Sequence, residues 1–129
     1  MSEAELYETL VKGFREVSSV LDERLSTLAA DPLLAELALR VESDPDSAGV
    51  KKALLSAVDS RTLSGAAEIV QYFAYRFRRD WLRIEVEKRY LECLTNENRR
   101  LTRHYERMLE AFSVDWEDRD LFPSLGEAQ

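Results

Sequence analysis

The sequence has very few of the residues that build metal centres, disulfides and covalent active sites. Its 129 residues include one cysteine, Cys93, and one histidine, His104. A single cysteine excludes an intramolecular disulfide, and zinc sites need sets of cysteine and histidine. Di-iron sites in helical bundles use Glu-x-x-His pairs, whereas no glutamate lies three residues before His104. We therefore expect neither a metal nor another cofactor.

Long apolar runs and glycine-rich loops are also missing. No segment approaches the roughly 20 apolar residues that a membrane span needs, and no glycine-rich phosphate-binding fingerprint occurs. The N-terminal residues Met-Ser-Glu-Ala-Glu are acidic and do not resemble a secretion signal. These features predict a cytoplasmic protein that does not bind membranes.

The charge is acidic overall but unevenly distributed. The formal net charge is −7, which argues against general binding of nucleic acid or anionic membranes by the whole surface. Residues 76–107 are the exception, with 10 basic and 6 acidic side chains. A basic segment between two acidic ones can be neutralised within the molecule, or it can form a local binding site.

Apolar residues recur at spacings of three and four, which predicts helices. Only three prolines and four glycines interrupt the chain. We expect an all-α fold, a compact bundle of four or five helices in a single domain over 1–113. The expected helices cover residues 2–29, from the restart at Asp31-Pro32 to Ser43, and 50–60. The first of them should have one apolar face, which consists of Leu6, Leu10, Phe14, Val17, Leu21, Leu25 and Leu28. Residues 114–129 are expected to form an acidic C-terminal tail that contains aromatic residues.

Residues from Ile69 to Phe112 contain no proline or glycine and predict one long C-terminal helix, bent or interrupted once. The weak points are Asp80 and the segment 95–98, whose side chains compete for backbone hydrogen bonds. A heptad pattern runs along this helix. Its first apolar position holds Ile84, Leu91, Asn98, Tyr105 and Phe112, and its second holds Leu94, Leu101 and Met108.

This stripe has two interpretations. A polar asparagine between leucines sets register in two-stranded coiled coils, so the stripe is a candidate for self-association as a homodimer. Packing of the stripe against the first helix of the same chain explains it too, and we favour this interpretation. Leu94, Leu101 and Met108 should be buried in either case. The candidate self-association residues are Leu91, Leu94, Asn98, Leu101, Tyr105 and Met108.

A second candidate site lies at the start of the long helix. Tyrosine and arginine are favoured at protein interfaces, so Tyr75, Arg76, Arg79 and Arg83 form a candidate partner-binding patch. Most other arginines of the helix fall on its outer face, where neighbouring glutamates can pair with them. A solvated structural face is favoured over a nucleic-acid site.

Catalysis by Cys93 and His104 is not expected. On one helix the two residues would lie about 16 Å apart, too far for a thiol–imidazole pair. The sequence therefore predicts a non-enzymatic interaction or regulatory protein that binds another macromolecule, most simply a protein, through a helical surface. The first alternative is an acidic inhibitor of a basic partner, of the immunity or nucleic-acid-mimicking type. The second is a nucleic-acid binder that uses the arginine face.

Overall fold

The computed structural model describes residues 2–127, and over this range it is helical, without a β-strand. The all-α prediction is therefore confirmed, but the helices are shorter and more numerous than expected. They are α1 (Glu3–Arg24), α2 (Thr27–Val41), α3 (Ala48–Asp59), α4 (Ala66–Phe77), α5 (Asp80–Thr95), α6 (Arg99–Glu110), the 3₁₀ helix η1 (Glu117–Leu121) and α7 (Pro123–Glu127).

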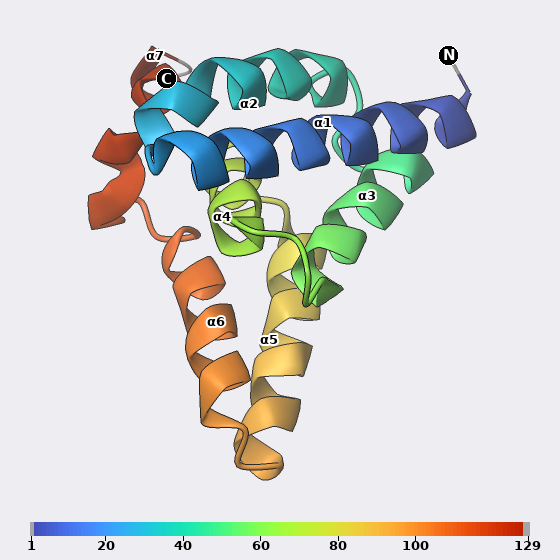
Figure 1. The fold of residues 1–129 in the computed structure, drawn as a ribbon. Coiled ribbons are helices and arrows are strands. Elements are labelled where there is room, and N and C mark those ends of the chain that lie inside the picture. Colours follow the sequence, from blue (N-terminus) through green and yellow to red (C-terminus); the bar gives the residue numbers. More distant parts are fainter. Residues whose placement is uncertain (1, 128–129) are drawn as a thin grey trace.

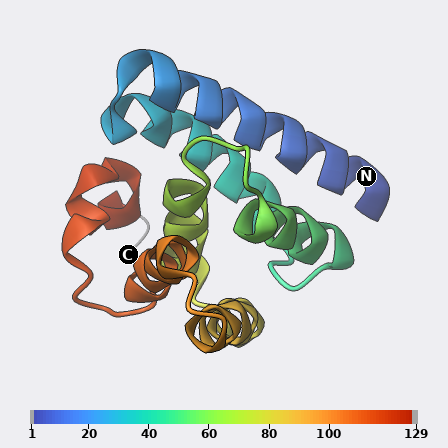
Figure 2. The same ribbon diagram turned by 60° about the horizontal axis from the view of Figure 1, so that its bottom comes forward.

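The helices form a broad body from which one hairpin projects. Helices α1 and α2 lie side by side, and α3 packs against α1 (Figure 1). The hairpin of α5 and α6 extends away from this layer, with its tip at the far end of the molecule (Figures 1 and 2). Helix α4 lies between the two parts, because it contacts α3 on one side and α6 on the other.

Helix α4 is the centre of the core. Apart from Glu68, every residue from Ala66 to Tyr75 is buried, as its apolar composition on all sides requires. The ring of Phe73 packs edge-on against Phe14 of α1 at 5.8 Å and against Tyr72 at 5.5 Å. The aromatic residues Tyr72, Phe73 and Tyr75 of this helix are thus interior residues.

The expected long helix over 69–112 is wrong, because the chain breaks at both weak points. Arg78 adopts a left-handed conformation with φ 49° and ends α4. Helix α5 ends in a Schellman motif, in which Glu97 has φ 56° and the N–H of Asn98 donates to the carbonyl of Cys93 at 3.0 Å. Asn98 then caps α6 by accepting from the N–H of Leu101 at 3.2 Å. Two breaks let α4, α5 and α6 pack against one another.

The first expected boundary also lies elsewhere. The chain turns at Leu25, which has φ 52°, and α2 begins at Thr27. Asp31 is therefore no cap but a buried residue inside α2, and Pro32 removes only one helical hydrogen bond from an exposed face. At the start of α4, Gly65 with φ 73° is the N-cap residue.

The C-terminal segment is part of the core. Trp116, Phe122 and Leu125 are buried, and the rings of Trp116 and Phe122 stack at 6.1 Å. Helix α7 packs against α2 and α4. Within the described residues, the expected boundary at 113/114 does not separate a free tail from the domain; residues 128–129 of the expected tail lie outside the described range.

Candidate functional site

The candidate partner patch does not form one exposed surface. Tyr75 is buried beneath the C-terminal segment, where its ring lies 5.8 Å from that of Trp116 and the Arg78 guanidinium lies 4.7 Å from its centre. The expectation that Tyr75 is exposed is wrong because α4 is the central helix. Arg76 is also largely covered, and its guanidinium lies 4.0 Å from Glu42.

Arg79 and Arg83 are half-exposed and paired. Arg79 donates two hydrogen bonds to Asp46, at 2.8 and 2.5 Å, and the indole of Trp81 donates to the same carboxylate at 2.8 Å. The hydrogen bond from Arg79 is the main reason that the pKa of Asp46 lies below its usual value. Arg83 bonds Glu87 on its own helix at 2.9 Å. Arg79 thus joins the start of α5 to the loop before α3, whereas Arg83 is paired within α5.

Three further arginines of residues 76–107 are also paired with carboxylates. Arg89 pairs with Asp59 and Glu85, Arg103 with Glu106 and Glu110, and Arg107 with Glu68. Within the part of the chain that the structure describes, Arg78 at the end of α4 and Arg99 and Arg100 at the tip of the hairpin form no ion pair. The basic segment is therefore neutralised largely within the molecule.

The six candidate self-association residues lie in three environments. Tyr105 and Met108 are buried, and Leu101 is half-buried against the core. Leu91 and Leu94 are 59% and 47% exposed, so the expected burial of Leu94 is wrong, and Asn98 caps α6. The seam does not exist as one stripe, because it required a continuous helix through residues 96–98.

One part of the stripe survives as an exposed apolar face. Ile84, Leu91 and Leu94 of α5 are 44%, 59% and 47% exposed, and we call them the α5 outer face. Their spacing of seven and three places them on one side of the helix. Leu82, Val86 and Cys93 occupy the opposite, buried side. Exposed aliphatic residues gathered in this way are typical of interaction surfaces.

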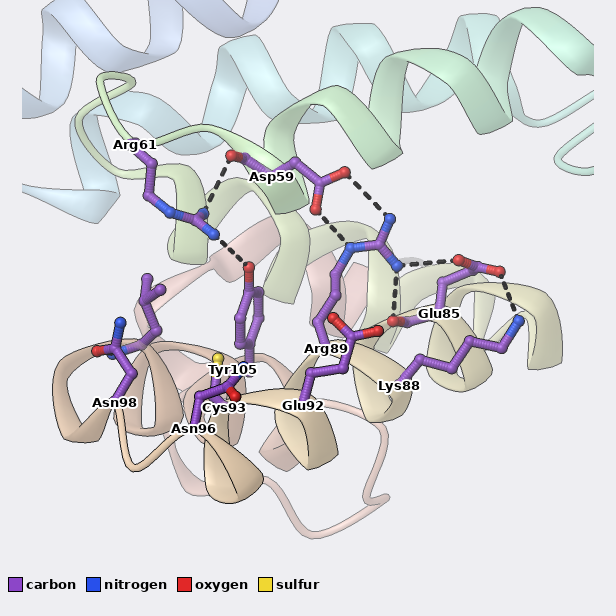
Figure 3. A pocket seen from close by; sticks show the side chains of 11 residues that line it. Asp59, Arg61, Glu85, Lys88, Arg89, Glu92, Cys93, Asn96, Asn98 and Tyr105 are labelled. Carbon is purple, nitrogen blue, oxygen red and sulfur yellow. Dashed lines mark hydrogen bonds and ion pairs between the residues drawn. The ribbon is translucent and has the colours of Figure 1, made fainter.

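The hairpin is tied to the body by a charged network around a pocket of about 500 Å³ (Figure 3). Arg89 of α5 donates to both carboxylate oxygens of Asp59 at the end of α3, and it bonds the Glu85 carboxylate at 2.9 Å. These carboxylates raise the pKa of Arg89, chiefly through the hydrogen bond to Asp59. The guanidinium therefore remains charged and clamps α5 to α3.

A second link joins the loop after α3 to α6. Arg61 donates to the hydroxyl of Tyr105 at 2.9 Å and to the backbone carbonyl of Asp59 at 3.0 Å (Figure 3). Cys93 lines the same pocket but is buried. The charged network links Arg89 with Asp59 and Glu85, and Glu85 with Lys88, so it ties the hairpin to the body.

Cys93 and His104 lie on two different helices, which corrects the expected placement on one. The His104 Nε2 atom is buried without a hydrogen-bond partner among the described residues, so no thiol–imidazole pair forms through it. Burial, reinforced by the positive charges of Arg61 and Arg107, lowers the pKa of His104. Residues 2–127 contain no cluster of three or more histidine, cysteine, aspartate or glutamate side chains that could hold a metal.

The sequence also concealed a second exposed apolar face. Leu28, Pro32, Ala35 and Leu39 follow the outer side of α2, and the two leucines are 59% and 63% exposed. Leu25 and Leu28 were expected to continue the buried face of the first helix, but the turn at Leu25 exposes both. The sequence does contain a signal for this exposed face. Residues 27–41 are apolar on nearly all sides of the helix, and a helix with a single buried face does not need this.

Comparisons with models of protein families, with curated proteins and with solved structures give no match for this chain. No helix among the described residues is both long and apolar enough to cross a membrane. The fold thus defines an all-α protein, and its exposed apolar surfaces are the features that bear on its function.

Proposed function

We propose that this chain is a non-enzymatic interaction protein that binds a protein partner through the α5 outer face. The observation that carries the proposal is the exposure of Ile84, Leu91 and Leu94 on one side of a projecting helix. Leaving large aliphatic groups in water forfeits about 25 cal/mol for each Å² of apolar surface that could be buried. A partner with an apolar groove recovers this free energy.

The support around this face suits recognition by a preformed surface. The clamp between Arg89 and Asp59, and the bond between Arg61 and Tyr105, fix both helices of the hairpin to the body. A surface held in its bound geometry loses little conformational entropy on binding. Because the clamp holds the hairpin in place, binding of a partner to the apolar side chains of α5 costs little conformational entropy.

The arginine pairs weigh against the nucleic-acid alternative. Phosphate binding by Arg103 or Arg107 would have to replace carboxylates that already bond these side chains. Arg78, Arg99 and Arg100 remain, but three exposed cations on a protein of net charge −7 supply little counterion release. A protein partner is the better match.

The proposal is tested by affinity capture from an extract of cells that express the protein. Three baits are compared: the wild type, the double variant Leu91→Glu/Leu94→Glu, and the single variant Val114→Glu. The last is the control, because Val114 is also exposed, at 69%, but lies outside the hairpin. We expect proteins that the wild type and the control retain but the double variant loses, as quantitative mass spectrometry measures. Equal retention by all three folded baits would overturn the proposal.

A further inference from the structure

A cavity of about 360 Å³ lies where the start of α4, the loop before it and α6 meet. We call it the α4–α6 cavity. No residue of α5 lines it, so it is separate from the α5 outer face, and it shares only Arg61 and Leu101 with the pocket of Figure 3. Small-molecule sites in proteins commonly enclose about 300–1,000 Å³. The cavity is therefore large enough for one small ligand.

The lining of the α4–α6 cavity is positively charged, in contrast to the chain as a whole. Arg61 comes from the loop, and Arg100 and Arg107 come from α6. Glu68 of α4 is the acidic member of the lining, so three positive charges and one negative charge leave a net charge of +2. On a protein of net charge −7, this local excess of positive charge favours a small anion as the occupant.

Two of the three arginines are not paired with carboxylates. Arg107 bonds Glu68 at 2.7 Å, but within residues 2–127 neither Arg61 nor Arg100 forms an ion pair. Arg61 is held beside the cavity by its bonds to the Tyr105 hydroxyl and to a backbone carbonyl, both uncharged acceptors. A guanidinium has five N–H donors, so Arg61 retains donors for a ligand. Arg61 and Arg100 are thus the charged anchors, and the pair of Arg107 and Glu68 stays intact.

The backbone at the start of α4 adds further donors. Gly65 is the N-cap and has no side chain to accept from the first N–H groups of the helix. The N–H of Ala66 donates to the Leu63 carbonyl at 3.2 Å, whereas those of Ala67 and Glu68 donate to no backbone acceptor in the described chain. All three of these helical residues line the cavity. N–H groups in this position bind anions in many proteins.

His104 is an independent indication of a ligand in the same cavity. Its ring lines the cavity, and its Nε2 atom is buried without a hydrogen-bond partner among the described residues. Buried polar atoms are nearly always satisfied in native proteins, and a bound ion or water is one common reason when the protein itself supplies no partner. Burial, then the charges of Arg61 and Arg107, lower the pKa of His104, whereas Glu68 raises it. Both guanidinium groups therefore act on this ring.

We propose that the α4–α6 cavity binds the phosphate group of a small phosphate monoester. A phosphate monoester has three terminal acceptor oxygens, and the cavity offers donors from three elements: Arg61 in the loop, Arg100 on α6, and the free N–H groups of α4. Arginine binds phosphate through two parallel hydrogen bonds. One phosphate group needs only these anchors, whereas a nucleic acid needs a row of them. This inference goes beyond the proposed function, since the site and the ligand are both different.

Titration of the purified, isotopically labelled chain with glycerol phosphate tests the proposal by NMR at constant ionic strength. No extract is used, so failure here is separate from failure of the proposed function. The amide signals of Ala67 and Glu68 should shift and saturate with a dissociation constant below about 1 mM, as a few charge-assisted hydrogen bonds allow. Acetate has only two oxygens and should bind at least about tenfold more weakly. No saturable shift, or equal binding of acetate, would overturn the proposal.

Arg100→Gln is the main variant, because Arg100 forms no ion pair that the fold needs. It should weaken binding of glycerol phosphate about fivefold or more, through the loss of charge-assisted bonds. Arg103→Gln is the matched control, since Arg103 is also on α6 but lies outside the cavity. It should bind like the wild type. Equal affinities of the two variants would contradict the site.

The source of the phosphate group is tested with a short peptide that contains phosphoserine. The cavity should bind glycerol phosphate at least as tightly as this peptide. A peptide that binds more than about tenfold more tightly would show that the occupant is a segment of another protein, and it would overturn the assignment to a small molecule.

The single histidine of the chain gives a second measurement. Sulfate is the probe, because its charge does not change over the pH range in which a histidine titrates. Saturating sulfate should raise the pKa of His104 above its value in sodium chloride of equal ionic strength, since an anion in the cavity offsets the charges of Arg61 and Arg107. The rise should be smaller in Arg100→Gln. An unchanged pKa in the wild type would show that no anion enters the cavity and would refute the proposal.

Discussion

The hydroxyl of Tyr72 on α4 lies 2.7 Å from the hydroxyl of Ser124 on α7, and neither side chain is open to solvent. Ser124 in turn donates its hydroxyl to the buried carboxylate of Asp31 on α2 at 2.7 Å, and its N–H to the same group at 3.1 Å. The order of donors means that Tyr72 donates to Ser124. Three helices distant in sequence are joined by one polar chain, which explains why residues 114–127 are folded.

Asp31→Ala should release α7 from α2. The loss of hydrogen bonds to a buried charged acceptor should lower the free energy of unfolding by about 2–3 kcal/mol. Proteolytic cleavage should then appear between α6 and η1. Chemical denaturation and limited proteolysis measure both effects. Glu36→Ala on the exposed side of α2 is the control and should change stability by less than about 0.5 kcal/mol; equal behaviour of the two variants would contradict the role of Asp31.

Tyr72 should titrate above the ordinary pKa of a tyrosine. Burial is the main cause that raises its pKa above 10.0. Since the folded pKa is raised, this contribution to stability is complete below about pH 10 and is lost as the pH rises through the folded value. Tyrosinate absorbance should show one delayed transition that Tyr72→Phe removes. An unchanged titration curve in the variant would mean that another tyrosine is responsible.

His104 should titrate below 6.5, because burial and the nearby Arg61 and Arg107 disfavour its charged form. Since the folded pKa is lowered, its contribution to stability is present above about pH 6.5 and is lost as the pH falls through the folded value. It is the single histidine of the chain, so its ring protons can be followed directly by NMR. A midpoint at or above 6.5 would show that the ring is more exposed than in this structure.

The clamp between α5 and α3 should matter more than an exposed ion pair. Arg89→Gln should cost about 1 kcal/mol, because it removes a bidentate bond at a side chain that is only 20% exposed. Arg103→Gln is the matched control, since Arg103 is 61% exposed, and it should cost less than about 0.5 kcal/mol. Equal costs in urea denaturation would show that Arg89 does not clamp the hairpin.

Gly49→Ala should disturb the contact between the start of α1 and the start of α3. A Cβ at this position would lie 2.6 Å from the Glu3 carbonyl oxygen, and the Gly49 N–H donates to the Glu3 carboxylate at 2.5 Å. We expect a loss of about 1–3 kcal/mol. Gly126→Ala meets no atom within 4 Å and should be nearly neutral. Thermal unfolding of both variants measures the difference. An unchanged melting temperature for Gly49→Ala would contradict the close contact between Gly49 and Glu3.

The sequence was sufficient for the fold class and for much of the core. The spacing of Leu10, Phe14 and Val17 correctly identifies the buried side of α1. The boundaries were harder, because Leu25, Arg78 and Glu97 adopt positive φ values without the glycine that usually signals them. Their conformations are set by how the helices pack, which local sequence does not encode.

The candidate sites were harder still to predict. The heptad stripe treated residues 84–112 as one face, but the turn at Glu97 sends Leu94 toward solvent and Tyr105 into the core. The sequence places Tyr75 on the surface because residues 69–77 match the start of an amphipathic helix, whereas α4 is surrounded on all sides. Which apolar side chains remain exposed depends on the number of neighbouring helices, and only the folded structure shows this.

Site-specific photo-crosslinking tests the central claim, binding through the α5 outer face, most directly. A photoreactive amino acid replaces Leu94 or, as a control, Val114, in cells that express the protein. Both positions are exposed, at 47% and 69%, so access alone does not favour either. The account predicts a discrete adduct with another protein from position 94 and none from position 114. Indistinguishable adducts from the two positions, or none from position 94, would contradict it.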